Sequence, residues 1–163
     1  MRMIPIRFTA GVMLCLGAVW LVGCTTPSRA PAPEVATVPS CQAAPSGETL
    51  VGNWLSVSTQ KGVVGTLRTL YTLNADGTMV YVEQVKRPGK PSQGLHESGC
   101  WRRDGAQLVL QTLFSNSSPV DSSDPIYVNR YEVQQAGAKE LIIRGDVGTV
   151  RARRMSPGYR LPF

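Results

Sequence analysis

Short apolar runs separated by turn residues fill the chain from residue 49 onward, and this alternation limits the possible folds more than any other feature. The runs are rich in Val, Ile, Leu, Thr and Tyr, the residues that favour strands. Asp76-Gly77 and Asp104-Gly105 stand between runs, and Asp-Gly pairs are preferred in hairpin turns because those turns need positive φ. The runs predict eight strands, at 51–59, 66–74, 78–86, 99–103, 107–114, 126–135, 140–144 and 149–155.

The predicted strands are joined mainly by hairpins, and no stretch in this part of the chain keeps the apolar period of a helix. Consecutive antiparallel strands form a meander, and closing the meander into a barrel removes the exposed edges of the sheet. The sequence therefore predicts an all-β fold, a small antiparallel up-and-down eight-stranded barrel over residues 49–155, followed by a C-terminal tail over 156–163.

The N-terminus has the pattern of an export signal. Arg2 and Arg7 precede an uncharged stretch, 8–23, that ends in Leu21-Val22-Gly23-Cys24. This end resembles the lipobox of bacterial lipoprotein precursors, so residues 1–23 are expected to be a cleaved signal peptide. The alternative, an uncleaved membrane helix, is disfavoured because the stretch is shorter than the roughly 20 residues that span a bilayer.

The lipoprotein resemblance implies that Cys24 carries a diacylglycerol and a further acyl chain such as palmitate, so that membrane lipid is a partner. More than one acyl chain makes such anchoring stable. Thr25 stands where an Asp would favour retention at the inner membrane, so in a diderm bacterium the expected location is the periplasmic face of the outer membrane. Nucleic acid is not expected as a partner there.

Residues 24–48 are predicted to be a disordered tether, because they hold five prolines and no aromatic residue. Beyond Cys24, only Cys41 and Cys100 remain in the mature chain. An oxidising periplasm favours a disulfide between them, which would pin the end of the tether to the barrel. The alternative is two free thiols, with Cys100 buried in a strand.

The positive charge gathers at the C-terminal end of the chain. Arg151 and Arg153 alternate with Val150 and Ala152, so the two arginines share one strand face. Such a run is typical of a solvated outer face, and the alternative is a patch that binds lipid phosphates or an acidic partner. Five arginines face the single Asp146 after Ile143: Arg144, Arg151, Arg153, Arg154 and Arg160.

Three motifs occur in an order that resembles the small lipocalin-like domains of bacterial lipoproteins. They are Gly52-Asn53-Trp54, then a strand ending in Asp76-Gly77-Thr78, then Gly99-Cys100-Trp101 before Leu108-Val109-Leu110. The resemblance spans about residues 50–155. It implies a lipocalin-like barrel, although the chain lacks the long helix after the barrel and the Thr-Asp-Tyr element of full lipocalins, which argues against a roomy ligand cavity.

The same resemblance implies that Trp54 packs across one end of the barrel and that Gly52 leaves room for the chain to approach it. In lipocalins an arginine from the last strands stacks on this tryptophan. Here the resemblance assigns that contact to Arg151 or Arg153.

Neither a catalytic nor a metal-binding group of residues is found. His96 is the only histidine in the sequence. It lies in the Pro/Gly-rich connection 87–97 and is expected to be an exposed loop residue. The Gly-x-Ser-x-Gly motif of many hydrolases is absent. Asp121 and Asp124 lie in a polar loop, 115–124, where a cation site is the alternative to a mobile loop at the barrel mouth. We therefore predict no enzyme, no cofactor and no metal.

The barrel interior leaves two functions open. Tyr71, Tyr81, Tyr127 and Tyr131 are expected to point inward, where they would form an amphipathic lining for a small hydrophobic ligand. The alternative is a solid core. A lined interior favours a ligand-binding protein, and a filled one favours an interaction module for an envelope protein, either an assembly accessory or an inhibitor-like barrel.

Overall fold

The computed structural model describes residues 40–59, 62 and 64–162, so the predicted signal peptide, Cys24 and most of the tether lie outside the described residues. In the described part, every regular element except one short 3-10 turn is an antiparallel strand. The elements are β1 (Gly52–Ser58), β2 (Thr66–Leu73), β3 (Thr78–Lys86), β4 (Gln93–Asp104), β5 (Gln107–Ser115), β6 (Ser118–Pro119), η1 (Pro125–Tyr127), β7 (Val128–Ala136), β8 (Glu140–Gly145) and β9 (Gly148–Met155).

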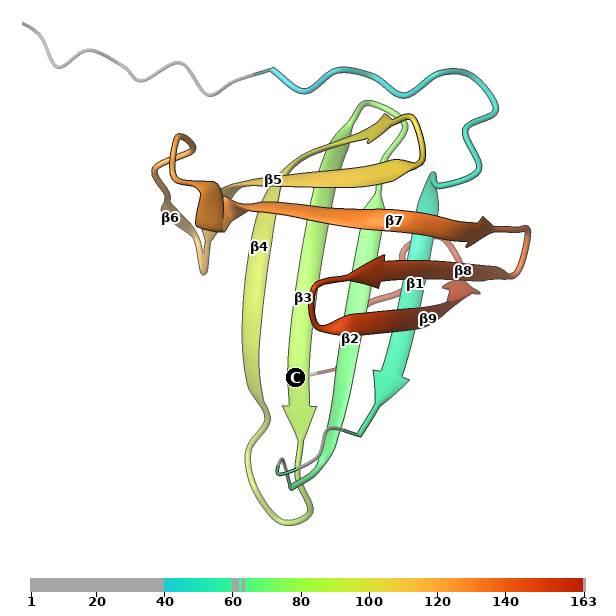
Figure 1. Ribbon diagram of the computed structural model, residues 1–163. Helices are drawn as coiled ribbons and strands as arrows, with labels where there is room; N and C mark the ends of the chain where they lie inside the picture. Colours follow the sequence, from blue (N-terminus) through green and yellow to red (C-terminus); the bar gives the residue numbers. More distant parts are fainter. Residues whose placement is uncertain (1–39, 60–61, 63, 163) are drawn as a thin grey trace, which may run out of the picture. The chain divides into compact units, whose positions relative to one another are not determined.

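The strands form a closed barrel in chain order (Figure 1). Each of the eight main strands pairs with the next along the chain, β5 pairs with β7, and β1 pairs with β9 to close the sheet. The short β6 is an extra strand on β5. This arrangement confirms the predicted all-β, up-and-down eight-stranded barrel.

β4 is longer than the sequence predicted. It begins at Gln93, which pairs with Val85 of β3, so the connection between the two strands shortens to residues 87–92. His96 is therefore an exposed strand residue, and its placement in a loop was wrong. Asn116 completes the edge of β4 here, since its Oδ1 accepts the His96 N–H at 3.0 Å and its own N–H donates to the His96 carbonyl at 2.7 Å.

The polar segment 115–124 was predicted to be a loop, but it contains the short strand β6. Asn116 and Ser117 have positive φ angles of 47° and 69°, and they turn the chain from β5 into β6. Asp124 then caps η1 by accepting the Ile126 N–H at 3.0 Å. As a result β7 begins at Val128, and Tyr127 lies in η1 instead of a strand.

The inner faces of the strands meet in a packed core. Trp54, Leu108, Leu141 and Ile143 are completely buried there, together with Leu50 from the segment before β1. A second apolar cluster lies on the opposite, outer face of β1–β3 and consists of Leu55, Leu70, Val82 and Leu161, with Val80, Met155 and Tyr159 packed against it. Because Leu161 and Tyr159 come from the C-terminal segment, that segment covers part of the outer face.

Candidate functional site

Trp54 closes one end of the core, as the family resemblance implied. Its indole Nε1 donates to the Leu50 carbonyl at 2.8 Å, and the guanidinium of Arg154 lies 4.0 Å from the ring centroid. Arg154 also donates to the carbonyls of Val51 at 2.8 Å and Thr49 at 2.9 Å. Gly52 makes this possible, because a Cβ at that position would lie 2.4 Å from Nη1 of Arg154.

The arginine that stacks on Trp54 is Arg154, so its assignment to Arg151 or Arg153 was wrong. Ala152 is buried in the core, and side chains two residues apart on a strand share a face. Arg154 therefore continues the inward face of β9, whereas Arg151 and Arg153 point out and are exposed. Arg151 lies 4.0 Å from Glu140.

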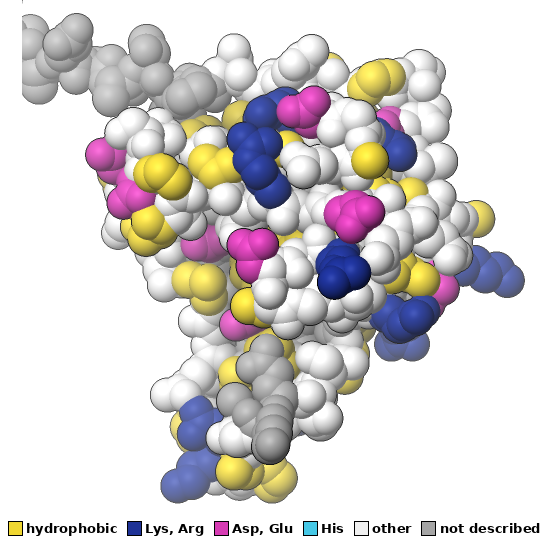
Figure 2. Space-filling model, viewed as in Figure 1, with side chains coloured by type: hydrophobic (Ala, Val, Ile, Leu, Met, Phe, Trp, Pro, Cys, Tyr) yellow, Lys and Arg dark blue, Asp and Glu magenta, His cyan; other side chains and the backbone are white. Residues whose placement is uncertain are grey.

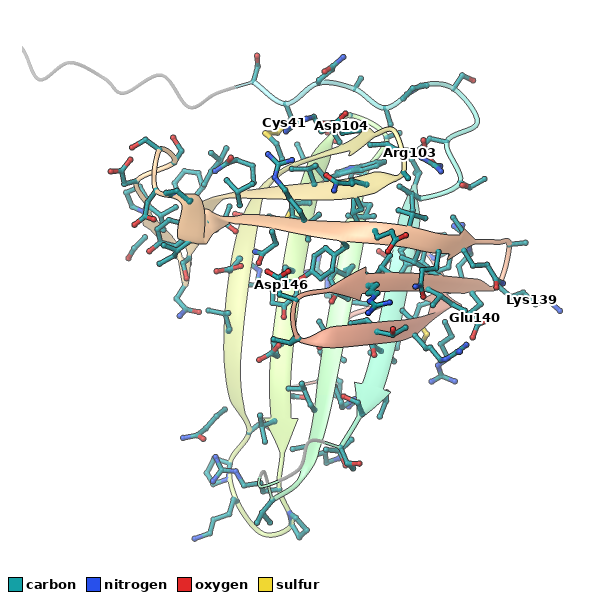
Figure 3. All side chains as sticks on the ribbon, viewed as in Figure 1. Cys41, Arg103, Asp104, Lys139, Glu140 and Asp146 are labelled. Carbon is teal, nitrogen blue, oxygen red and sulfur yellow. A yellow bond between two sulfur atoms is a disulfide. The ribbon has the colours of Figure 1, made fainter. Side chains whose placement is uncertain are left out.

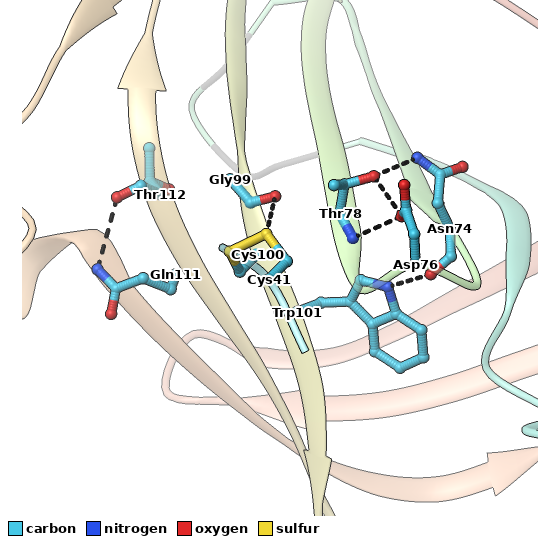
Figure 4. Close-up of a disulfide and its surroundings, with 9 residues drawn as sticks. All are labelled: Cys41, Asn74, Asp76, Thr78, Gly99, Cys100, Trp101, Gln111 and Thr112. Atoms are coloured by element: carbon cyan, nitrogen blue, oxygen red, sulfur yellow. Dashed lines mark hydrogen bonds between the residues drawn. A yellow bond between two sulfur atoms is a disulfide. The ribbon is translucent and has the colours of Figure 1, made fainter. Parts of the chain in front are cut away.

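Cys41 and Cys100 form a disulfide, with their Cα atoms 5.2 Å apart, which confirms the predicted pairing (Figure 4). The bond joins the segment before β1 to β4. Ala44 of this segment donates to the Ala75 carbonyl at 2.9 Å, and Gln42 packs on Gly77, where a Cβ would lie 1.9 Å from the Gln42 carbonyl oxygen. The segment is therefore held across the β2–β3 turn.

Three of the four predicted tyrosines meet inside the barrel. The Tyr71 ring lies 5.3 Å from that of Tyr81 and 6.3 Å from that of Tyr131, in both cases edge to face. Burial is the main cause that raises the pKa of each of these phenols above its ordinary value. They therefore stay protonated and act as hydroxyl groups at neutral pH. Tyr127 does not join them, because it lies in η1.

Two carboxylates lie beside these tyrosines, and the sequence reasoning missed them. The Tyr81 hydroxyl donates to Glu83 at 2.6 Å, and the Thr112 hydroxyl donates to Glu97 at 3.2 Å. Strict alternation from Tyr81 places Glu83 on the same face, and Glu97 is the direct partner of Tyr81 across the sheet. The pattern of β3 alone was thus enough to find Glu83.

Below Trp54, the core consists of large side chains that fill the space between the strands. Met79, Leu110 and Trp101 are each at most 2 % exposed, and Tyr71 packs against the same cluster. The interior at the Trp54 end of the barrel is therefore filled with side chains. This is the solid core that the sequence analysis gave as the alternative to a tyrosine-lined ligand cavity.

A groove of about 710 Å³ lies on the outside of the barrel, between the outer face of β1–β3 and the C-terminal segment. We name it the outer groove. Its apolar walls come from both the strands and the C-terminal segment, and the basic residues that line it are His96, Arg154 and Arg160. Six apolar residues in its walls are Leu70, Val80, Val82, Met155, Tyr159 and Leu161.

Charged side chains do not form a single-sign patch on the face that β7–β9 present. Figure 2 shows basic and acidic side chains interspersed there. Figure 3 places Lys139 and Glu140 together at the β7–β8 turn, and Asp146 at the other end of β8. The C-terminal arginines are thus divided between this mixed surface, the contact with Trp54 and the outer groove.

Asp121 and Asp124 both serve as local hydrogen-bond acceptors. Asp121 accepts from the backbone and the hydroxyl of Ser123, at 2.9 and 2.6 Å, and these bonds lower its pKa. Across the described residues, no three His, Cys, Asp or Glu side chains lie close enough together to hold a metal ion. The same part of the chain contains no helix long and apolar enough to cross a membrane.

No protein-family model matches this chain, and no curated protein matches its sequence. Of the predicted lipocalin-like domain, the structure confirms the eight-stranded antiparallel barrel. The lipoprotein assignment, the location and the absence of catalysis stay predictions.

Proposed function

We propose that this chain is a non-catalytic, lipid-anchored protein of the bacterial cell envelope whose barrel domain binds a small hydrophobic ligand. The observation that carries the proposal is the outer groove, with a volume of about 710 Å³ and apolar walls. Ligand sites in proteins are mostly apolar concavities of about 300–1,000 Å³ with a few polar groups. The outer groove has both the size and the composition of such a site.

The packing of the interior supports a site outside the barrel. Trp54, Tyr71 and the aliphatic side chains around them occupy the core, and the tyrosines contact one another. A ligand would have to displace these side chains to enter the core, at a cost of several contacts per residue. The outer groove needs no such displacement.

The Cys41–Cys100 disulfide supports the proposed exported state. Disulfides persist in oxidising compartments such as the bacterial periplasm and are rare in the cytosol. The proposed export and lipid anchoring also rest on the N-terminal sequence. It has basic residues, then an uncharged stretch, then Leu21-Val22-Gly23-Cys24.

Mass spectrometry of the chain purified from its bacterial host in mild detergent tests the proposal. Covalent acyl groups stay on the chain in the denatured spectrum, whereas a ligand held in the groove adds mass only to the native spectrum. We expect a native excess that disappears on denaturation and matches one apolar molecule. Identical native and denatured masses across several preparations would contradict ligand binding.

An interaction module is the second candidate, and the loop end of β1–β4 favours it. Val57 and Val64 are 54 % and 77 % exposed there, Lys86 is the last residue of β3, and Lys90 lies in the adjacent β3–β4 connection. Gly65 lies against Lys86, which brings the β1–β2 connection close to the end of β3. A photo-crosslinking residue at position 64 would capture an envelope protein in cells if this end is an interface. The exposed position 147 provides the matched control.

A further inference from the structure

The outer face of β1–β3 is apolar where a barrel surface is normally polar. Leu55, Leu70 and Val82 are buried on this face, although Trp54, Tyr71 and Tyr81 on the same strands point into the core. A sheet that is apolar on both faces needs a cover on each. The core covers the inner face, and the outer face needs a second layer.

The C-terminal segment supplies only part of that layer. The Tyr159 N–H donates to the Ser156 carbonyl at 3.2 Å and Gly158 has a φ of +77°, so Ser156-Pro157-Gly158-Tyr159 turns the chain back over the strands. Three hydrogen bonds fix it there, from Asn53 to the Ser156 carbonyl, from Arg68 to the Tyr159 hydroxyl, and from Gln84 to the Pro162 carbonyl. The outer groove is the space that this layer leaves over Leu70, Val80 and Val82.

The charge of the outer groove has one sign. Among the described residues that line it, two are arginines and one is a histidine, and none is an aspartate or a glutamate. Arg154 is already bound to two carbonyls and to the Trp54 ring. Arg160 is exposed and forms no ion pair with any residue that the structure describes. His96 lies directly across the sheet from Val82 and also lines the outer groove.

We propose that the outer groove binds an anionic amphiphile with a single alkyl chain. The alkyl chain lies over Leu70, Val80 and Val82 under the C-terminal segment, and the anionic head, a carboxylate or a phosphate, pairs with Arg160. Arginine binds both heads through paired N–H groups. This assignment rests on the proposed ligand-binding function and names the class of its ligand.

A diazirine derivative of dodecanoic acid, applied to the full chain in host membranes, tests the assignment. We expect crosslinks on tryptic peptides 69–86 and 155–160, which carry the walls of the groove. Unlabelled dodecanoate and dodecyl phosphate should compete at least tenfold better than dodecanol, since one charge-assisted contact of about 1.4 kcal/mol corresponds to a tenfold difference in affinity. Whichever of the two anions competes more strongly identifies the head group.

Two substitutions locate the contacts. Arg160→Gln should reduce competition by dodecanoate to the level of dodecanol, and this change leaves the core intact because Arg160 is exposed. Val80→Trp should fill the groove and abolish both crosslinks. Arg144→Gln, an exposed arginine outside the groove, is the control and should change neither result.

The outcomes separate the two proposals. Crosslinks in the groove with equal competition by dodecanol, or an unchanged preference in Arg160→Gln, would overturn the anionic head and leave hydrophobic ligand binding in place. Crosslinks confined to other peptides would overturn the groove as the site. Equal native and denatured masses of the purified chain would remove the proposed function itself.

Discussion

The guanidinium of Arg154 makes three contacts, with two carbonyls and with the Trp54 ring. A substitution that removes the guanidinium removes all three contacts. We expect Arg154→Met to lower the free energy of unfolding by about 1–3 kcal/mol, from the cation–π contact and the two hydrogen bonds. Arg153→Met, at the exposed neighbouring position, should change it by less than about 0.5 kcal/mol. Urea unfolding followed by tryptophan fluorescence measures both, and equal effects would contradict the assigned contact.

Glu48 links the segment before β1 to Arg103 near the end of β4, and its side chain is only 8 % exposed. Burial alone would raise its pKa, but the Leu50 N–H at 3.1 Å and Arg103 at 3.0 Å outweigh burial and lower it. A pKa below that of the unfolded chain stabilises the fold above the unfolded value of about 4.3, and this stability is lost as the pH falls through the folded pKa.

Glu48→Gln should therefore lower the free energy of unfolding by about 0.5–1 kcal/mol at pH 7, with the difference shrinking as the pH drops below about 4. Urea titrations of both proteins across this pH range measure the effect. Glu140→Gln is the control, because Glu140 lies 4.0 Å from Arg151 in a much more exposed pair. A difference between wild type and Glu48→Gln that does not depend on pH would rule out the ionised carboxylate as its source.

The prediction that Arg151 or Arg153 stacks on Trp54 was wrong, and the reason lies in the residue pattern of β9. The sequence pattern correctly placed Arg151 and Arg153 on one face and favoured a solvated outer face for them, whereas the family resemblance assigned one of them to Trp54. Ala152 decides between the two, because it is buried against Leu141 and makes the even positions of β9 the inner ones. A small residue carries little apolar signal, and so the alternation of this strand was ambiguous.

Among the elements, seven strands lie within two residues of their predicted starts and ends, because their apolar alternation and their turn residues agree. β4 differs, since its first half carries Gly94, His96 and Glu97, which lack an apolar pattern. Pairing with β3 makes this half a strand in spite of its composition. The outer groove was missed because it forms from residues far apart in the chain, although Leu55 and Leu70 gave a signal by being apolar on the outer face.

The disulfide closes a loop between residues 59 positions apart. The chain-entropy model assigns such a crosslink about 4 kcal/mol of stability. We expect the double variant Cys41→Ser, Cys100→Ser to have a free energy of unfolding lower by about this amount, and so to unfold at a lower urea concentration. Its circular dichroism spectrum without urea should be the same as that of the wild type. Wild type measured in reducing agent should match the variant, and a reduced protein as stable as the oxidised one would contradict this role.

For the whole molecule, the proposed anchor gives a direct prediction. Cells grown with an alkyne analogue of palmitate should label the wild-type chain and leave Cys24→Ala unlabelled, because Cys24 is the predicted acylated residue. Cys41→Ala should keep the label, since Cys41 belongs to the disulfide. In-gel fluorescence after click coupling measures both. Label on Cys24→Ala would place the lipid elsewhere or contradict the lipoprotein assignment.

The disulfide also determines how the barrel carries a mechanical load. Without it, a pull on the chain ahead of Cys41 would first load the contacts of residues 42–51 and then β1, whose pairs with β2 and β9 would open one after another. With it, the load passes through the sulfur atoms into β4, which is hydrogen-bonded on both sides by β3 and β5. In the proposed lipid-anchored state, the disulfide thereby protects the domain from unravelling at its N-terminal end.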